Sequence, residues 1–230
     1  MRFLTLMWKE FRESLPWLLL ATIVLLAMGG FTLRLEIQNP RPDWYYSGIT
    51  PGETVDTYRL IQSTVLSVPG AWLFVISIGL GLASGIRQFW MPYFTKTWAF
   101  ELHRSVSRAT ILSAKLCTTL LAFCLPVGMV WTIFYYYSCR PGLLIMPPPL
   151  RIFIEGWIFI ALGFVTYLGT ALVGLSEARW YTTKIFGLGL AAIVFLMIFH
   201  WKLSWVFTSM TIGAVMLLSQ IIYTFHNREF

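Results

Sequence analysis

Long apolar runs, more than any local motif, limit what this chain can fold into. Short polar segments separate six of them, at 15–33, 63–86, 116–137, 152–175, 185–199 and 205–225. Most approach the roughly 20 residues that a helix needs to cross a bilayer core. Only 12% of the 230 residues are charged, against roughly 25% in soluble domains. We therefore predict an all-α integral membrane protein, with six transmembrane helices in a single domain over residues 1–230.

The first residues have the periodicity of a helix but not the length of a span. Apolar and polar side chains fall on two different faces, Leu4, Met7, Trp8, Phe11 and Leu15 against Arg2, Thr5, Lys9 and Arg12. This pattern predicts an interfacial amphipathic helix at 1–14, with the chain changing direction at Pro16 before the first span. A cleaved signal peptide is the alternative, which the length of this segment and its acidic residues Glu10 and Glu13 disfavour.

The fifth apolar run, 185–199, has 15 residues and is rather short for a crossing. Aromatic residues on both sides, Trp180, Tyr181 and Trp201, extend it toward the two interfaces. A re-entrant segment is the alternative, and it would leave five crossings with the termini on opposite sides. We expect six crossings.

Two spans carry small residues spaced four apart, which places them along one ridge of a helix. The ridges are Ser77, Gly81 and Gly85 in the second span, and Thr166, Thr170 and Gly174 in the fourth. Small side chains let two membrane helices approach closely. We therefore predict helix packing along both ridges.

The distribution of Lys and Arg favours one orientation in the membrane. With the N-terminus inside, the cytoplasmic segments contain 11 of these residues and the outer segments six. We expect a multi-pass protein of the cell inner (plasma) membrane, with both termini and the 87–115 loop in the cytoplasm. The net charge of +7 is spread over short segments, where it meets anionic membrane lipids. No basic run is dense enough to predict nucleic-acid binding.

The sequence offers few groups for catalysis or ion transport. The spans hold no ionisable residue near their centres, which disfavours an ion-coupled carrier. The three histidines are far apart and the three cysteines lack metal-ligand spacing, so we expect no catalytic residues and no metal site. A phosphate-binding loop of the Gly-x-x-x-x-Gly-Lys-Ser/Thr type is also missing. We do not expect an enzyme, and any ATP that drives the chain binds to a separate subunit.

The 87–115 loop is basic and has helical periodicity. Phe94, Trp98 and Leu102 recur every four residues, beside a polar stripe formed by Thr97, Glu101, Arg104 and Arg108. The pattern predicts a helix over 94–108 with an aromatic face toward the membrane and a charged face toward the cytosol. Two roles remain open for such a helix: it caps the second and third spans, or it docks a soluble partner.

Residues 97–108, followed by Ile111 and Lys115, resemble the signature of the type-2 ABC exporter permeases. The matching residues are Thr97, Phe100, Leu102, Val106, Ser107, Arg108, Ile111 and Lys115. Three positions depart from the family pattern: Lys96 stands in place of Gly, Ala99 in place of Glu, and Ser105 in place of Pro. The predicted topology is similar to that family along the whole chain, from the interfacial helix to the basic loop between spans two and three.

This resemblance implies the transmembrane permease subunit of an ATP-binding cassette exporter. In that family the inner loop forms a coupling helix that docks on a cytoplasmic ATPase subunit. The ATPase-coupling residues would be Thr97, Trp98, Phe100, Glu101, Arg104, Ser107, Arg108 and Lys115. ATP and Mg would act through that partner, with no cofactor in this chain, and a second permease chain would complete a homodimer or heterodimer. The alternative is a non-transporting membrane scaffold that recruits a cytosolic partner through the 87–115 loop; a membrane-embedded enzyme is disfavoured further.

Overall fold

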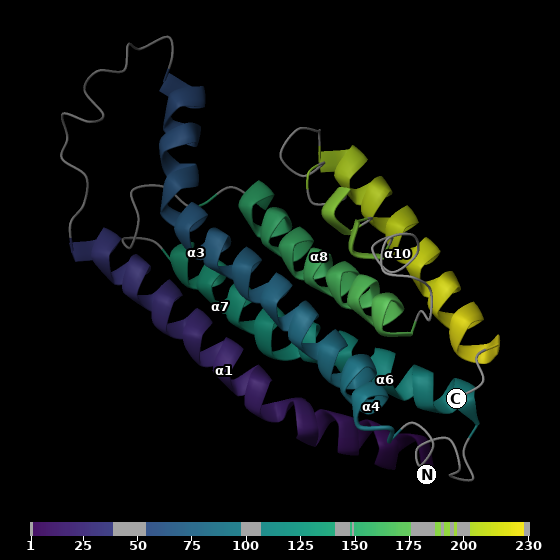
Figure 1. Ribbon diagram of the computed structural model, residues 1–230. Coiled ribbons are helices and arrows are strands. Elements are labelled where there is room, and N and C mark those ends of the chain that lie inside the picture. Colours follow the sequence, from purple (N-terminus) through teal and green to yellow (C-terminus); the bar gives the residue numbers. More distant parts are fainter. Residues whose placement is uncertain are drawn as a thin grey trace.

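The computed structural model describes residues 2–38, 54–97, 107–140, 148, 150–175, 187–189, 191–193, 196 and 203–227. Within these residues the regular structure is entirely helical (Figure 1). In chain order the helices are α1 (Arg2–Gln38), α3 (Thr54–Gly85), η1 (Ile86–Trp90), α4 (Met91–Phe94), α6 (Arg108–Ala122), η2 (Phe123–Val127), α7 (Gly128–Ser138), α8 (Leu150–Leu175) and α10 (Leu203–Asn227). The elements η1 and η2 are single turns of π-helix inside longer helices.

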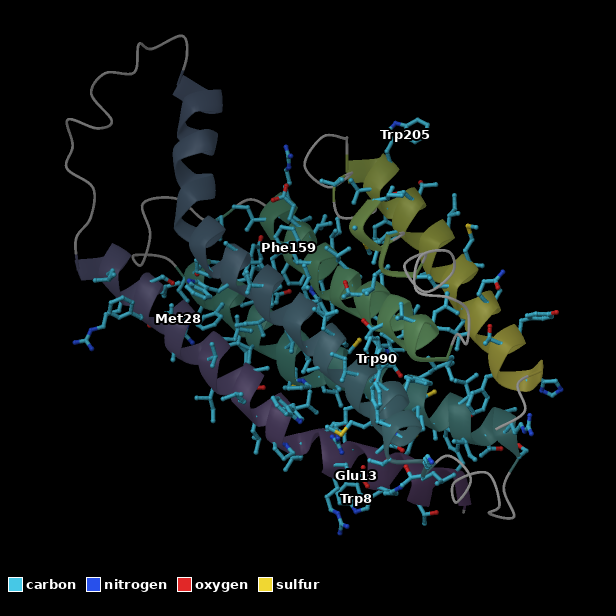
Figure 2. All side chains as sticks on the ribbon, in the orientation of Figure 1. Trp8, Glu13, Met28, Trp90, Phe159 and Trp205 are labelled. Carbon is cyan, nitrogen blue, oxygen red and sulfur yellow. The ribbon has the colours of Figure 1, made fainter. Side chains whose placement is uncertain are left out.

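Five of the described helices are long and apolar enough to cross a membrane. They are Phe3–Leu35, Pro69–Trp90, Arg108–Ser138, Leu150–Leu175 and Trp205–His226. Exposed Trp8 and Trp205 lie toward opposite ends of the bundle (Figure 2). Amphipathic aromatic rings of this kind favour the two membrane–water interfaces. The chain is an all-α membrane protein, as its composition predicts.

Helix α8 is the central helix of the bundle. In its apolar window 78% of the residues are buried, compared with 22% in α1. Figure 1 shows α8 between α3 and α10, with α1 on the outer side of α3 and α7. One apolar cluster joins α8 to α10 around Leu168 and Leu217, and a second joins α1, α3 and α7 around Leu25 and Trp131. The exposed apolar residues of α1 and α10 are suited to contact with lipid.

Helices α3 and α8 pack closely in parallel, and their contact runs along the small residues of both helices. A methyl group added at Gly81 would meet the Gly163 carbonyl oxygen, and one added at Gly85 would lie 2.6 Å from Thr170 Cβ. Further along, Gly174 receives the ring of Trp90. Because side chains are missing at these points, the two backbones approach to a distance that larger residues would prevent.

Several helix ends meet at one end of the bundle. Helices α1 and α6 begin there, and the continuous α3–η1–α4 helix ends there. Lys115 of α6 connects them, since it contacts both Glu10 of α1 and Gln88 of η1. The end of α8 joins them through Gly174 and Trp90. The end of α10 joins through His226, which contacts Arg108. We call this the charged end.

Several predicted boundaries are wrong. The 1–14 segment is not a separate helix, because α1 continues through Pro16. Pro16 lies in the interior of α1, where it removes one backbone hydrogen bond and its ring opposes the carbonyl of Arg12, and the helix continues on both sides of it. The predicted loop over 34–62 is shorter, since α1 extends to Gln38 and α3 begins at Thr54. Most of the predicted fifth span, 185–199, lies outside the described residues.

Candidate functional site

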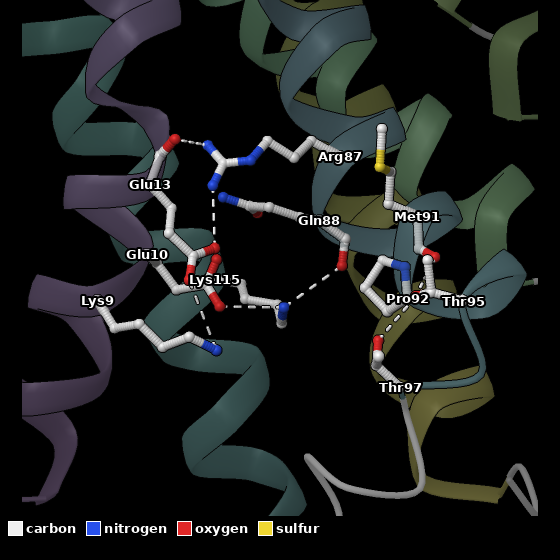
Figure 3. A pocket seen from close by; sticks show the side chains of 10 residues that line it. All are labelled: Lys9, Glu10, Glu13, Arg87, Gln88, Met91, Pro92, Thr95, Thr97 and Lys115. Atoms are coloured by element: carbon white, nitrogen blue, oxygen red, sulfur yellow. Dashed lines mark hydrogen bonds and ion pairs between the residues drawn. The ribbon is translucent and has the colours of Figure 1, made fainter.

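A polar cavity lies at the charged end, between the first turns of α1, the η1–α4 turn and α6 (Figure 3). Its volume is about 450 Å³. The lining residues are Lys9, Glu10, Glu13, Arg87, Gln88, Met91, Pro92, Thr95, Thr97 and Lys115. Three helices that are distant in sequence therefore contribute charged side chains to one place.

The deepest interaction in this site is the ion pair between Glu10 and Lys115. The Lys115 ammonium donates to Glu10 Oε1 over 3.1 Å and to the backbone carbonyl of Gln88 over 3.3 Å. Only 2% of the Lys115 surface and 7% of the Glu10 surface are exposed. A charge removed from water in this way is tolerated because it meets an opposite charge and further hydrogen bonds. The pair joins the N-terminal helix to the helix that follows the 98–106 segment.

Gln88 continues the polar contacts from the ion pair into the bundle. Its amide nitrogen donates to the Thr119 hydroxyl over 3.1 Å, and the Tyr167 hydroxyl donates to its amide oxygen over 2.7 Å. All three side chains are buried. One residue of the π-turn η1 therefore connects α6 with the central helix α8. Such turns are rare and occur often at functional positions.

A second group of charges lies nearer to solvent. Arg87 donates to the Glu13 carboxylate over 2.9 Å and also to the backbone carbonyl of Glu13. Lys9 lies 3.8 Å from the same carboxylate, four residues earlier on α1. Because these side chains are partly exposed, each pair contributes on the order of 0–1 kcal/mol to stability. Their main effect is to hold the η1 turn against α1.

The helix before the 98–106 segment ends in a Schellman motif. The Thr97 amide donates to the Pro92 carbonyl over 3.0 Å, and the Thr95 amide donates to the Met91 carbonyl over 2.9 Å. Between these residues, Lys96 has a φ of 54°. The left-handed conformation at this position is usually taken by Gly, because a side chain there crowds the backbone. The chain therefore leaves α4 with a fixed direction.

The helix after the segment begins with an N-cap at Ser107. This residue is extended, and its hydroxyl accepts a hydrogen bond from the Thr110 amide over 3.2 Å. A capping hydroxyl satisfies one of the amides that have no partner inside the helix. The neighbouring Arg108 is the first residue of α6 and donates to the His226 carbonyl over 3.2 Å. Both ends of the segment are thus fixed to the bundle.

The structure brings together only some of the residues predicted to couple to a partner. Thr97 and Lys115 line the cavity, whereas Ser107 and Arg108 are exposed at the start of α6. Trp98, Phe100, Glu101 and Arg104 lie outside the described residues. The prediction of one helix over 94–108 is wrong at both ends: α4 ends at Phe94, and the next helix begins at Arg108. The predicted 87–115 loop is correspondingly shorter, because its first and last turns belong to membrane helices.

Sequence reasoning missed the roles of Glu10, Glu13, Arg87 and Gln88. In the sequence, Glu10 and Glu13 are noted only as acidic residues of the predicted interfacial helix, and Lys115 only as one of the predicted ATPase-coupling residues. Opposite charges near the ends of neighbouring spans, at the same depth, are the signal that could have paired them. Gln88 has no such signal, because only the fold places it beside Thr119 and Tyr167.

The described residues contain no group of three His, Cys, Asp or Glu side chains that could hold a metal ion. Comparison with known proteins finds no matching family model, no matching curated protein and no matching solved structure. The charged end is therefore the candidate functional site. It can hold a polar ligand in a cavity, and its hydrogen bonds connect α1, the η1 turn, α6 and α8.

Proposed function

We propose that this chain is the transmembrane permease subunit of an ATP-binding cassette exporter, driven by a separate cytoplasmic ATPase. The 98–106 segment would carry the coupling contacts, with Glu101 and Arg104 making polar contacts and Trp98 and Phe100 anchoring it. Two permease chains, identical or related, would form the translocation path. ATP and Mg would be held by the ATPase subunits.

The observation that carries this proposal is how the 98–106 segment is attached. It is preceded by the Schellman motif of α4 and followed by the Ser107 cap of α6. Through Gln88 and Lys115 these two helices are bonded to α8 and α1. A force applied to the segment would therefore reach α4 and α6 directly, and α8 and α1 through these bonds. Rigid-body rocking of a bundle is one of the established ways in which such a displacement opens and closes a path.

The direction of the helices supports six crossings. Helices α8 and α10 both end at the charged end, so the chain between them has to return to the opposite end before α10 begins. Residues 187–189 and 191–193 are helical, and Gly187 packs against the Gly169 carbonyl of α8. A fifth crossing near 185–199 accounts for both facts. With six crossings both termini lie on one side, which the distribution of Lys and Arg makes the cytoplasm.

Purification of the tagged chain from its own cells tests the proposal. We expect an ABC ATPase to copurify, and its ATP hydrolysis to change when the permease is present. Recovery of a different cytosolic protein in fixed proportion, with no ATPase, would support the scaffold instead. In that case the export function would be abandoned.

A pair of variants then tests the coupling segment. Glu101→Ala with Arg104→Ala is expected to reduce ATPase binding by more than tenfold, because charge-assisted contacts each contribute about 1.5–3 kcal/mol. The control is Arg140→Ala. Arg140 is exposed and follows the last turn of α7, at the end of the bundle opposite the charged end. Arg108 is a poorer test, since its contact with His226 links α6 to α10 within the chain. Unchanged ATPase binding and export in the double variant would contradict the coupling assignment.

A further inference from the structure

The cavity at the charged end has the chemistry of a small ligand site. Its volume of about 450 Å³ falls within the range of 300–1,000 Å³ that is usual for such sites. Figure 3 shows the side chains of Glu10, Glu13, Arg87 and Lys115 converging between the helices. Their charges decide which ligand fits.

The lining favours an anion over a cation. Among the described residues that line the cavity, three are cationic and come from three helices, Lys9, Arg87 and Lys115. The two carboxylates, Glu10 and Glu13, both come from α1, and each already faces a cation. A ligand cation would have to compete with those bonded cations. All three cations face a carboxylate too, but Lys9 and Arg87 share the single Glu13 carboxylate, so the described lining carries one more positive than negative charge, which favours an anion.

The donors also suit a group with several oxygen atoms. Within the described part of the chain, Glu13 accepts from two of the five N–H groups that an arginine offers. Lys9 and Thr97, which carry an ammonium and a hydroxyl group, line the cavity with Arg87. Guanidinium and ammonium groups that converge in this way are typical of phosphate recognition.

The position of the cavity matches the level of lipid headgroups. Trp8 on α1 is 67% exposed, and Met91 and Phe94 on α4 are 58% and 71% exposed. Apolar side chains exposed beside charged ones at the end of a span are typical of the membrane interface. Met91 and Pro92 also form an apolar part of the cavity wall, which would suit the glycerol portion of a lipid.

We propose that this cavity binds a phosphate group, held by Lys9 and Arg87 and supplied by a phospholipid headgroup or by a soluble phosphate. This inference does not depend on the proposed export function. It concerns the membrane-embedded chain itself, so it can be tested without an ATPase.

The test uses the delipidated full chain in detergent and three probes: dioleoyl phosphatidylglycerol, dioleoylglycerol and inorganic phosphate. Native mass spectrometry and thermal unfolding measure binding. We expect phosphatidylglycerol to bind and stabilise, and dioleoylglycerol, which has the same tails without phosphate, to bind at least about tenfold more weakly. Displacement of the lipid by millimolar inorganic phosphate would identify a soluble source. Retention of the lipid under that condition would identify the headgroup.

Matched charge reversals locate the site. Lys9→Glu is expected to weaken phosphatidylglycerol binding about tenfold, the factor for one charge-assisted contact. Arg12→Glu, on the same helix but outside the cavity lining, makes the same change in net charge and is expected to change binding less than twofold. Lys9→Ala serves as a second variant if charge reversal disturbs folding. Equal weakening by Lys9→Glu and Arg12→Glu, or equal binding of dioleoylglycerol, would overturn the proposal.

Discussion

Lys115 shows how the surrounding residues stabilise a single buried charge. A lysine at this depth loses most of its hydration, which costs several kcal/mol. Glu10 and the Gln88 carbonyl replace that hydration with two directed bonds. An apolar pair of similar volume would often be as stable. The main effect of the ion pair is therefore to fix the position of α1 relative to α6. Its geometry is specific where a purely apolar contact would allow sliding.

Removal of one partner should therefore be costly. Lys115→Met is expected to lower the free energy of unfolding by about 3–5 kcal/mol, because the Glu10 carboxylate is left buried without its cation. Glu10→Gln together with Lys115→Met should recover more than half of the loss. Denaturant unfolding in micelles, followed by tryptophan fluorescence, measures both. Additive losses in the double variant would show that the two side chains do not interact.

At Lys96, whose backbone is in the left-handed conformation, we expect a substitution to stabilise the protein. A non-glycine residue in this conformation costs roughly 1–2 kcal/mol. Lys96→Gly removes the clash at the end of α4 and should stabilise the chain by about 1 kcal/mol. Lys96→Ala is the control, because it removes the ammonium but keeps the Cβ atom, and it should give no gain. Thermal unfolding of the three proteins decides between a backbone effect and a charge effect.

At the scale of elements, the contact between α3 and α8 depends on glycines, which have no side chain to hold the two backbones apart. Gly81 and Gly163 allow the backbones to touch, and a larger residue at either position would push the helices apart. Ser77 lies in the same contact with its hydroxyl buried and, within the described residues, without a hydrogen-bond partner. Close packing of backbone carbonyls against small residues, and not side-chain hydrogen bonding by Ser77, therefore holds the two helices together here.

Two glycines of α3 provide a direct comparison. Gly81→Ala is expected to destabilise by about 1–3 kcal/mol, because its methyl group would overlap the Gly163 carbonyl oxygen. Gly79→Ala lies two residues away with nothing within 4 Å of the added atom, so it should be neutral or slightly stabilising. Unfolding in micelles measures both variants. Similar effects at the two positions would mean that helix propensity, and not packing, controls this helix.

Features encoded by the spacing of residues within one helix could be predicted from the sequence, whereas contacts between distant helices could not. Spacing within one helix revealed the small residues at 77, 81 and 85, and the α3–α8 contact runs along them. The partner of Lys115 lies 105 residues away, and no periodicity encodes such a pairing. The continuation of α1 through Pro16 was missed for another reason. Proline favours a break only on average, and here the following turns remain helical.

At the scale of the whole molecule, the charged end and the opposite end differ in composition. The charged end contains Lys9, Arg87, Arg108 and Lys115, whereas the opposite end contains Arg140, the pair Arg151 and Glu155, and Trp205 in the first turn of α10. An asymmetry in basic residues is the feature that sets orientation during insertion. This asymmetry is the basis of the proposed orientation, in which the charged end lies in the cytoplasm.

Reporter fusions test that orientation. A cytoplasm-active reporter fused after residue 230 should be active, and one fused at Arg140 should be inactive, because α7 ends opposite the charged end. The reverse pattern is expected for a reporter that is active only outside the cytoplasm. Activity of the same reporter at both positions would contradict the topology and would remove the support for a cytoplasmic 98–106 segment.

The π-turn η1 has one more consequence, for tolerance to mutation. A π-turn contains one residue more than the α-turn that it replaces. Deletion of exposed Ile86 should therefore let Ile86–Trp90 close into an ordinary α-turn, with Gln88 and α4 kept on their present faces. Deletion of Ile23, which is also exposed but lies in the regular helix α1, would rotate all later residues by about 100°. The η1 turn is thus a position at which the length of the chain is adjustable, next to the junction of its helices.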